Sequence, residues 1–306
     1  MKKIIIGTAC IMIVGICVGT LFYENLDALP MDAKQNNITV IEQTKPLQPF
    51  YVDDLTGYSL ENDQLQITFN SGNAWIEVPI EKEKLFEGEY SGSKTELIDD
   101  SYILSQGHAY FLYSNENDSN ETSIELLYTK NEGKTWGNIV VVDRYPLIRF
   151  RKVEFLNDSF GYVIISGDRT MSQEWTNVYI TKDGGMQWKE ATHSNITRLI
   201  SDGGFVSEEI GFLSFGILNP EEPDLHVTQD GGASWREANI NIPEKYNKIF
   251  VLAEVPFKED DYLAVYINQG PNGDYQGGKV KGKFISNDNG KTWEFLKEVT
   301  PNEPKI

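Results

Sequence analysis

The chain has 306 residues, a formal net charge of −19 and a sequence pI near 4.6. So acidic a chain argues against nucleic acid as a partner, because phosphate binding needs clustered Lys and Arg side chains. The length allows a sizeable core, and the 12% content of aromatic residues suits an all-β chain.

The N-terminal segment, residues 4–22, is apolar and uncharged, with Lys2 and Lys3 before it. Its length fits a membrane-spanning helix, and the positive charge predicts a cytoplasmic N-terminus. We expect residues 1–22 to anchor a single-pass protein in the cell membrane and residues 23–50 to tether an extracellular domain. The alternative is a cleaved signal peptide, which would leave a secreted protein.

Both cysteines of the chain, Cys10 and Cys17, lie in this apolar segment. The exported part therefore has no disulfide, and its own core must hold it together. A short Lys-Lys start and disulfide-free export favour a bacterial, Gram-positive protein.

One eight-residue pattern organises the remaining chain. The stretch Thr181–Trp188 reads TKDGGMQW, and four other stretches repeat its spacing of Ser/Thr, Asp/Asn, Gly and Trp. The Asp/Asn, Gly and Trp positions of the five copies are Asn70, Gly72, Trp75; Asn131, Gly133, Trp136; Asp183, Gly185, Trp188; Asp230, Gly232, Trp235; and Asp288, Gly290, Trp293.

Each copy follows one run with strand character and opens another, so it connects two antiparallel strands. The Asp or Asn at the third position is expected to accept backbone N–H bonds from two residues on, which closes an Asx-type turn. The invariant Gly at the fifth position suits a backbone with positive φ. The Trp covers the turn and needs a partner for its indole N–H.

This pattern resembles the Asp-box, or BNR repeat, of sialidases and many other β-propellers. The box tryptophans recur at roughly 50-residue intervals, which suits a four-stranded propeller blade. The resemblance implies an all-β fold, a β-propeller of four-stranded antiparallel blades over residues 51–306. Five boxes predict five blades, and six remain an alternative if the N-terminal segment contributes more strands.

The third blade is the clearest, with strands expected over residues 148–156, 161–167 and 177–181 and a fourth from Trp188. The first blade offers only three candidate strands, and the last is expected to open over residues 249–255. Residues 81–96 are too long for a simple connection and too charged for a core, so we expect an exposed excursion there.

Propeller geometry puts the boxes on one side of the blades and the loops after the second and fourth strands on the other. In families that this chain resembles, ligands usually bind on the second side. We therefore expect the boxes to be structural turns. The candidate binding residues fall in the opposite loops: Arg144, Tyr145, Arg149, Arg169, Trp175, Arg198, Tyr246 and Tyr275. The arginines suggest a pocket for an anion, and the alternative is that they cover apolar rims of solvated loops.

The sequence gives little support for catalysis. Sialidases, which the boxes resemble, carry a Phe/Tyr-Arg-Ile-Pro motif, and this chain has none; Ile148-Arg149-Phe150 is no convincing remnant. No spacing of the three histidines suggests a metal site, and we expect no cofactor. We predict a non-catalytic, membrane-tethered module that binds a protein partner at the cell surface. The alternative is a module that binds a cell-surface glycan, with or without glycoside hydrolase activity.

Overall fold

The computed structural model describes residues 46–116 and 122–300. The chain divides into two compact units, Met1–Thr44 and Lys45–Ile306, and every described residue belongs to the second. In the part of the chain that is described, no helix is long and apolar enough to cross a membrane. The predicted membrane segment, residues 4–22, lies outside that part.

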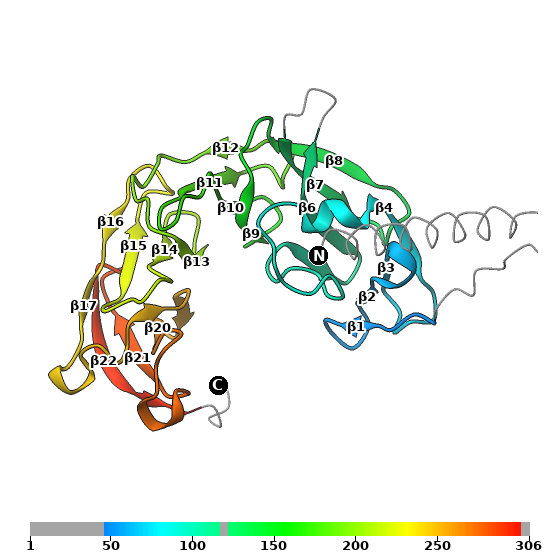
Figure 1. The fold of residues 1–306 in the computed structure, drawn as a ribbon. Coiled ribbons are helices and arrows are strands. Elements are labelled where there is room, and N and C mark those ends of the chain that lie inside the picture. Colours follow the sequence, from blue (N-terminus) through cyan, green and yellow to red (C-terminus); the bar gives the residue numbers. More distant parts are fainter. Residues whose placement is uncertain (1–45, 117–121, 301–306) are drawn as a thin grey trace, which may run out of the picture. The chain divides into compact units, whose positions relative to one another are not determined.

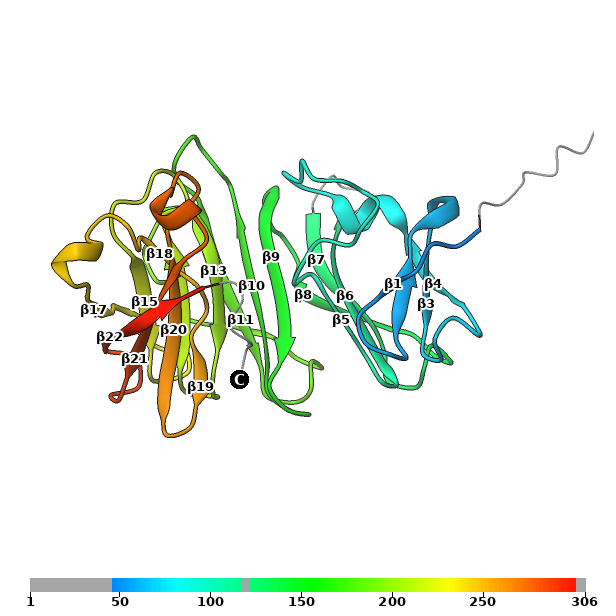
Figure 2. The same ribbon diagram turned by 90° about the horizontal axis from the view of Figure 1, so that it is seen from below.

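The described residues form five sheets in chain order, four of them with four antiparallel strands (Figures 1 and 2). Sheet 1 contains β1 (Phe50–Tyr51), β2 (Gly57–Ser59), β3 (Gln64–Thr68) and β4 (Ile76–Glu81). Sheet 2 contains β5 (Tyr102–Ser105), β6 (His108–Glu116), β7 (Thr122–Thr129) and β8 (Gly137–Val142). Sheet 3 contains β9 (Ile148–Phe155), β10 (Gly161–Gly167), β11 (Trp175–Thr181) and β12 (Lys189–Glu190). Sheet 4 contains β13 (Ile200–Phe205), β14 (Gly211–Phe215), β15 (Asp224–Thr228) and β16 (Arg236–Glu237). The all-β prediction is confirmed, and so are the four-stranded antiparallel sheets.

Sheet 5 has additional strands. It contains β17 (Asn239–Asn241), β18 (Leu252–Ala253), β19 (Phe257–Glu259), β20 (Tyr262–Asn268), β21 (Lys281–Ser286) and β22 (Thr292–Val299). The single opening strand expected over residues 249–255 is wrong: β18 and β19 pair separately with β20. Pro256 lies between them and cannot donate a ladder hydrogen bond, which accounts for the break. The segment β17 leaves sheet 4 and pairs in parallel with β22.

Sheet 1 gains a fourth strand that the sequence pattern did not indicate. The two-residue strand β1 pairs with β2, with Phe50 opposite Tyr58. The rings of these two residues stack at 5.3 Å between centroids.

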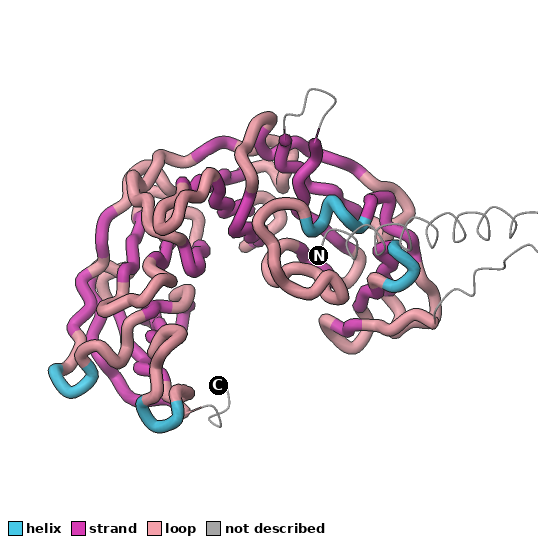
Figure 3. The backbone as a smooth tube through the Cα atoms, viewed as in Figure 1, coloured by secondary structure: helices cyan, strands magenta, loops and turns pink. Residues whose placement is uncertain are grey.

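Helical structure among the described residues is limited to four short 3-10 segments (Figure 3). These are η1 (Glu61–Asp63), η2 (Lys82–Phe86), η3 (Glu244–Tyr246) and η4 (Tyr275–Gly277).

The segment between sheets 1 and 2 begins with η2, and we call its residues 82–89 the strap. The expectation that this excursion lies wholly outside the core is wrong. Leu85 and Phe86 are buried, 3% and 2% exposed, in the cluster that sheets 1 and 2 share. Two apolar side chains within a charged run are enough to hold the strap against the core, because each contributes about 1.5–3 kcal/mol on burial.

The core lies between the sheets. One cluster joins Leu112 and Ile124 of sheet 2 to Val153 and Ile165 of sheet 3. Other clusters join sheets 1 and 2, sheets 3 and 4, and sheets 4 and 5. Sheets 2, 3 and 4 thus bury both faces, which explains nearly continuous apolar strands such as β10.

Each of the five boxes forms the hairpin turn between the third and fourth strands of its sheet, or between β21 and β22 in sheet 5. The same pattern of hydrogen bonds closes every one of these turns. In the third copy the Thr181 hydroxyl donates to Asp183 Oδ1 at 2.8 Å and accepts from Gly185 N at 2.9 Å. Asp183 Oδ1 then accepts from Gln187 N at 2.9 Å. We expected the Asp side chain to accept from the backbone N–H two residues on, and this is wrong. The carboxylate accepts from the N–H four residues on, and the Thr hydroxyl accepts from the N–H of the Gly.

The positive φ predicted for the box glycines is confirmed in every copy, from 73° at Gly133 to 89° at Gly185. The residue before each box Gly also has positive φ, including Glu132 at 56°. Two consecutive left-handed residues give the turn the twist that joins antiparallel strands. We call this end of each sheet the box end and the opposite end, with the loop between the second and third strands, the loop end.

Candidate functional site

A pocket of about 710 Å³ opens at the loop ends of sheets 2 and 3. Three segments form it: the end of the strap, the ends of β6 and β7, and the linker from β8 to β9. Its lining residues are Glu87, Gly88, Ser114, Glu116, Thr122, Arg144, Tyr145, Pro146, Leu147 and Ile148. The pocket thus brings Arg144 and Tyr145, two of the predicted binding residues, together with two carboxylates.

Close backbone packing fixes the strap side of the pocket. Gly88 has φ of 109°, and a Cβ at this position would lie 2.2 Å from the carbonyl oxygen of Ile148. The next residue, Glu89, donates its N–H to that same oxygen at 2.8 Å. Only Gly fits this approach, so the strap lies directly on the start of β9.

A buried arginine holds the strap side of the pocket in place. Arg151 of β9 is 3% exposed, and its guanidinium donates to the carbonyl oxygens of Leu85 and Glu87 in the strap. Its burial lowers the pKa of Arg151 to about 10, and the nearby Glu87 carboxylate opposes that shift. Among the described residues, Arg151 Nε has no hydrogen-bond partner. The cation therefore serves to hold the strap backbone in place.

The two carboxylates of the pocket interact with each other. Partial burial raises the pKa of Glu87, and the negative charge of Glu116 raises it further, against the effects of Lys84 and Arg151. Ser114 is 1% exposed, and its hydroxyl is buried with no partner among the described residues. A buried hydroxyl without a partner needs an explanation, and a bonded water molecule is one.

The remaining wall of the pocket is the segment between β8 and β9, residues 143–147, which we call the linker. Tyr145 donates its backbone N–H to Thr122 O at 2.8 Å and its phenol to Asn177 Oδ1 at 2.9 Å. The ring is 8% exposed, and burial raises its pKa above the ordinary tyrosine value. Tyr145 is thus a neutral anchor that ties the linker to both sheets rather than a phenol free to bind or react.

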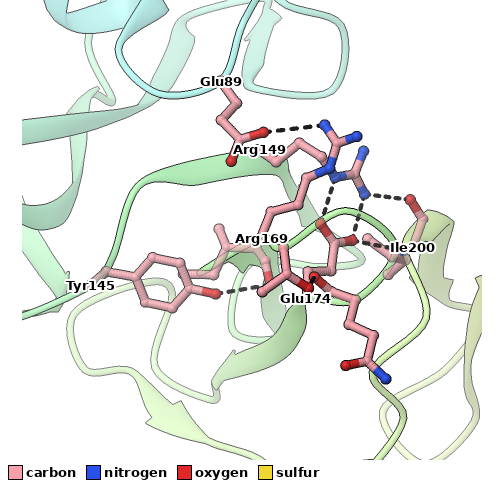
Figure 4. A network of polar contacts seen from close by, with 9 residues as sticks. Glu89, Tyr145, Arg149, Arg169, Glu174 and Ile200 are labelled. Carbon is pink, nitrogen blue, oxygen red and sulfur yellow. Dashed lines mark hydrogen bonds and ion pairs between the residues drawn. The ribbon is translucent and has the colours of Figure 1, made fainter.

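Arg149, predicted as a binding residue, is engaged inside the fold. Its Nε and Nη2 each lie 2.6 Å from an oxygen of Glu174, whose side chain is 0% exposed, and Nη2 also donates to Ile200 O at 2.6 Å (Figure 4). Glu174 accepts from Ile200 N at 2.8 Å as well. Since Ile200 starts β13, this bidentate pair joins the loop ends of sheets 3 and 4.

The arginines Arg169 and Arg198 are also paired. Arg169 Nη1 lies 3.2 Å from Glu89 Oε2 in the strap (Figure 4), and Arg198 pairs with Asp224 at the start of β15. Asp224 also receives a 2.9 Å bond from His226. Arg149, Arg169 and Arg198 each pair with a carboxylate of the chain, and Arg144 is the predicted arginine that lines the pocket. The anion-pocket hypothesis stays a prediction.

The predicted tyrosines Tyr246 of η3 and Tyr275 of η4 pack against sheet 5, in a separate cluster. Both donate to Glu298 Oε1, the second at 3.1 Å, and their rings meet edge to face at 6.3 Å. Lys245 covers Tyr246 at 4.3 Å from the ring centroid. The polar groups of this cluster satisfy one another, as in a structural network.

Trp175 is not a loop residue, because it begins β11 and pairs with Gly167. Its side chain is nevertheless 48% exposed. The exposed apolar residues Leu147 and Met171 belong to the linker and to the loop between β10 and β11.

The sequence reading missed Glu87, Ser114 and Glu116. Glu87 was hidden in a charged run that also seemed exposed, and Ser114 stands within an ordinary strand pattern.

A second, smaller hollow of about 480 Å³ at the loop ends of sheets 1 and 2 was also missed. There Glu125 is buried and accepts bonds from Tyr113, Asn115, Ser123 and Asn138. Its acceptor sites are filled, so it has little capacity left for a ligand.

Comparisons with known proteins agree on the repeat. The BNR/Asp-box repeat family matches residues 284–295, the fifth copy. The predicted resemblance to the BNR-type propeller superfamily is thereby confirmed, with no specific member indicated, and the shared hydrogen bonds identify the other copies as the same turn. A search of curated proteins found no match.

Similar solved structures include a family 117 glycoside hydrolase from Zobellia galactanivorans, at 12% identity and a TM-score of 0.39, over 66% of this chain and 69% of that one. A GH43_1 enzyme from Xanthomonas citri has 10% identity and a TM-score of 0.36, over 66% of this chain and 74% of that one. A protein of unknown function from Dyadobacter fermentans has 14% identity and a TM-score of 0.39, over 76% of this chain and 66% of that one. Similarity at this level carries no argument about activity.

Proposed function

We propose that this chain is a glycan-binding propeller of five blades, displayed outside the cell on an N-terminal membrane anchor, and that the pocket between sheets 2 and 3 holds the glycan. The observation that carries the proposal is the combination of two carboxylates, Glu87 and Glu116, with Arg144 in one pocket of about 710 Å³. Sugars present many hydroxyl groups that donate to carboxylates, and their C–H faces fit apolar walls such as Pro146 and Leu147.

The charge of the pocket favours neutral or basic sugars. Glu87 and Glu116 face the ligand space with a single arginine, and the whole chain carries a net charge of −19. An anionic sugar would be repelled by this field. This differs from the anion-pocket hypothesis, in which the arginines dominate, and the two can be separated by experiment.

The test is a glycan array probed with the full-length chain in detergent, including neutral, N-acetylated and sialylated glycans. We expect binding to neutral or N-acetylated glycans, weakened about tenfold or more in Arg144→Ala and Glu87→Gln. Lys189→Ala, an exposed residue of β12, is the matched control and should bind as the wild type does. A silent array, or binding that Arg144→Ala leaves intact, would reject the pocket.

Cleavage is the second arm of the same test. Glycoside hydrolysis uses a pair of carboxylates, one of them with a raised pKa, and Glu87 and Glu116 of the pocket are the candidate pair. Product analysis by mass spectrometry after incubation with the bound glycan separates a lectin-like module from an enzyme. Turnover that disappears in both Glu87→Gln and Glu116→Gln would assign hydrolysis to this pair.

The membrane anchor is part of the proposal and rests on the uncharged segment 4–22 after Lys2 and Lys3. Protease added to intact cells should digest residues 51–306, and protection of this domain would overturn the topology. Recovery of the domain from the medium would instead indicate a cleaved signal peptide.

A further inference from the structure

We infer that Trp175 forms a second sugar subsite beside the pocket, so that the ligand is an oligosaccharide rather than a single sugar. This inference rests on the proposed glycan-binding function. It starts from the register of sheet 3, in which Ile148, Gly167 and Trp175 lie opposite one another on β9, β10 and β11. Directly paired residues of antiparallel strands project from the same face of the sheet.

The face in question is the one turned toward sheet 2. Tyr179, four residues after Trp175 on the same strand, packs in the cluster that contains Leu112 and Ile124 of sheet 2. Asn177, two residues after Trp175, accepts the Tyr145 phenol at 2.9 Å. Side chains at alternate positions of a strand share a face, so Trp175 stands on the same face as the pocket wall.

The linker lies between the pocket and Trp175. A Cβ on Gly167 would lie 2.8 Å from Leu147 O and 3.0 Å from the Tyr145 ring, so the linker rests directly on this glycine. Leu147 is 59% exposed and Trp175 is 48% exposed. The linker that lines the pocket therefore rests on the residue paired with Trp175, and it carries the exposed apolar side chain of Leu147.

The separation decides the size of the ligand. Ile148, which lines the pocket, and Trp175 are two strand spacings apart, about 10 Å. A six-membered ring built from bonds of about 1.5 Å is too small to fill the pocket and also lie on the indole. An exposed, rigid aromatic face that loses little entropy on binding is a typical anchor for such a second unit.

Isothermal titration calorimetry on the full-length chain with oligomers of one to four units tests this, with N-acetylglucosamine and xylose as the two probe series. We expect the affinity to rise with length, and Trp175→Ala to lower it roughly tenfold for the longer oligomers while leaving the shortest binder unchanged. Trp175→Tyr should retain most of the gain. Leu218→Ala removes an apolar residue of similar exposure, 51%, from the loop of sheet 4, and should have no effect.

The outcomes separate the subsite from the pocket. If the wild type binds with no dependence on length, or if Trp175→Ala keeps the length dependence, the subsite is wrong while the pocket stands. If Trp175→Ala weakens every oligomer equally, Trp175 belongs to the pocket itself and the second subsite is rejected. If neither series binds to the wild type, both proposals fail for these sugars.

Discussion

Lys152 of β9 reaches Asp202 of β13 at 2.9 Å and Asp100, which precedes β5, at 3.3 Å. One side chain therefore links the first strands of sheets 3 and 4 to the segment that leads into sheet 2. Burial lowers the pKa of Lys152, but the two carboxylates outweigh that effect and raise it. The ammonium is charged at neutral pH and pairs with both carboxylates.

Lys152→Met should lower the free energy of unfolding by about 1–3 kcal/mol, the loss of hydrogen bonds between charged groups. The loss stays moderate because the partner side chains are 52% and 31% exposed and remain hydrated. Urea unfolding measures it. An unchanged midpoint would show that this link between the sheets contributes nothing to stability.

The pair Arg149–Glu174 should be more costly to break, because Glu174 has no access to water. We expect Arg149→Met to lower the free energy of unfolding by about 3–5 kcal/mol, since it leaves an uncompensated buried charge. The double variant Arg149→Met with Glu174→Leu should recover most of that loss. A double variant as unstable as the single one would show that the bonds to Ile200, not the buried charge, dominate.

The box hydroxyl provides a prediction about the turns. Thr181→Ala removes the acceptor for Gly185 N and the donor to Asp183, so we expect a loss of about 1–3 kcal/mol. Thr181→Ser should be nearly neutral, because Ser286 makes the same bonds in the fifth copy. Chemical denaturation of both variants tests this, and equal stability of the two would remove the account of the turn.

The boxes could be predicted from sequence because their chemistry is local. Every hydrogen bond that closes the turn joins residues within a seven-residue stretch, and the box repeats five times along the chain. The strand order of sheets 2 to 4 follows from the same repetition. The short strand β1 and the break at Pro256 were missed because each depends on only a few residues.

The site could be predicted only in part, because its partners are distant in sequence. Arg169 and Glu89 are separated by 80 positions, and a chain with 46 acidic residues offers no way to select Glu89. The strap was misread because Leu85 and Phe86 carry no periodic pattern. Position relative to the boxes nevertheless placed Arg144 and Tyr145 on the side where the pocket opens.

Acid should weaken the fold through Glu125. Burial raises the pKa of this carboxyl, but bonds from Asn115, Asn138, Ser123 and Tyr113 outweigh burial and lower it. A lowered folded-state pKa gives stability that is present above the unfolded value of about 4.3 and lost as the pH falls through the folded value.

The measurement is the free energy of unfolding between pH 2 and pH 6. Glu125→Gln should show a smaller loss over this range than the wild type, because it removes one contributing group. Tyr113→Phe, which removes one donor and keeps the carboxylate, should fall between the two. Identical pH dependence in all three proteins would mean that this network adds nothing to acid sensitivity.

Ser114 allows ligand binding and stability to be tested separately. Its hydroxyl is buried in the pocket wall without a partner, and Ser166 of β10 has an equally buried hydroxyl without a partner away from the lining. Ser114→Ala and Ser166→Ala should each change the free energy of unfolding by less than about 1 kcal/mol, since no hydrogen bond among the described residues is lost. Only Ser114→Ala should weaken glycan binding, by severalfold, as measured by calorimetry with the oligomer that binds best. Equal binding by the two variants would remove Ser114 from the site, whereas a large loss of stability in Ser114→Ala would show that the hydroxyl serves the fold.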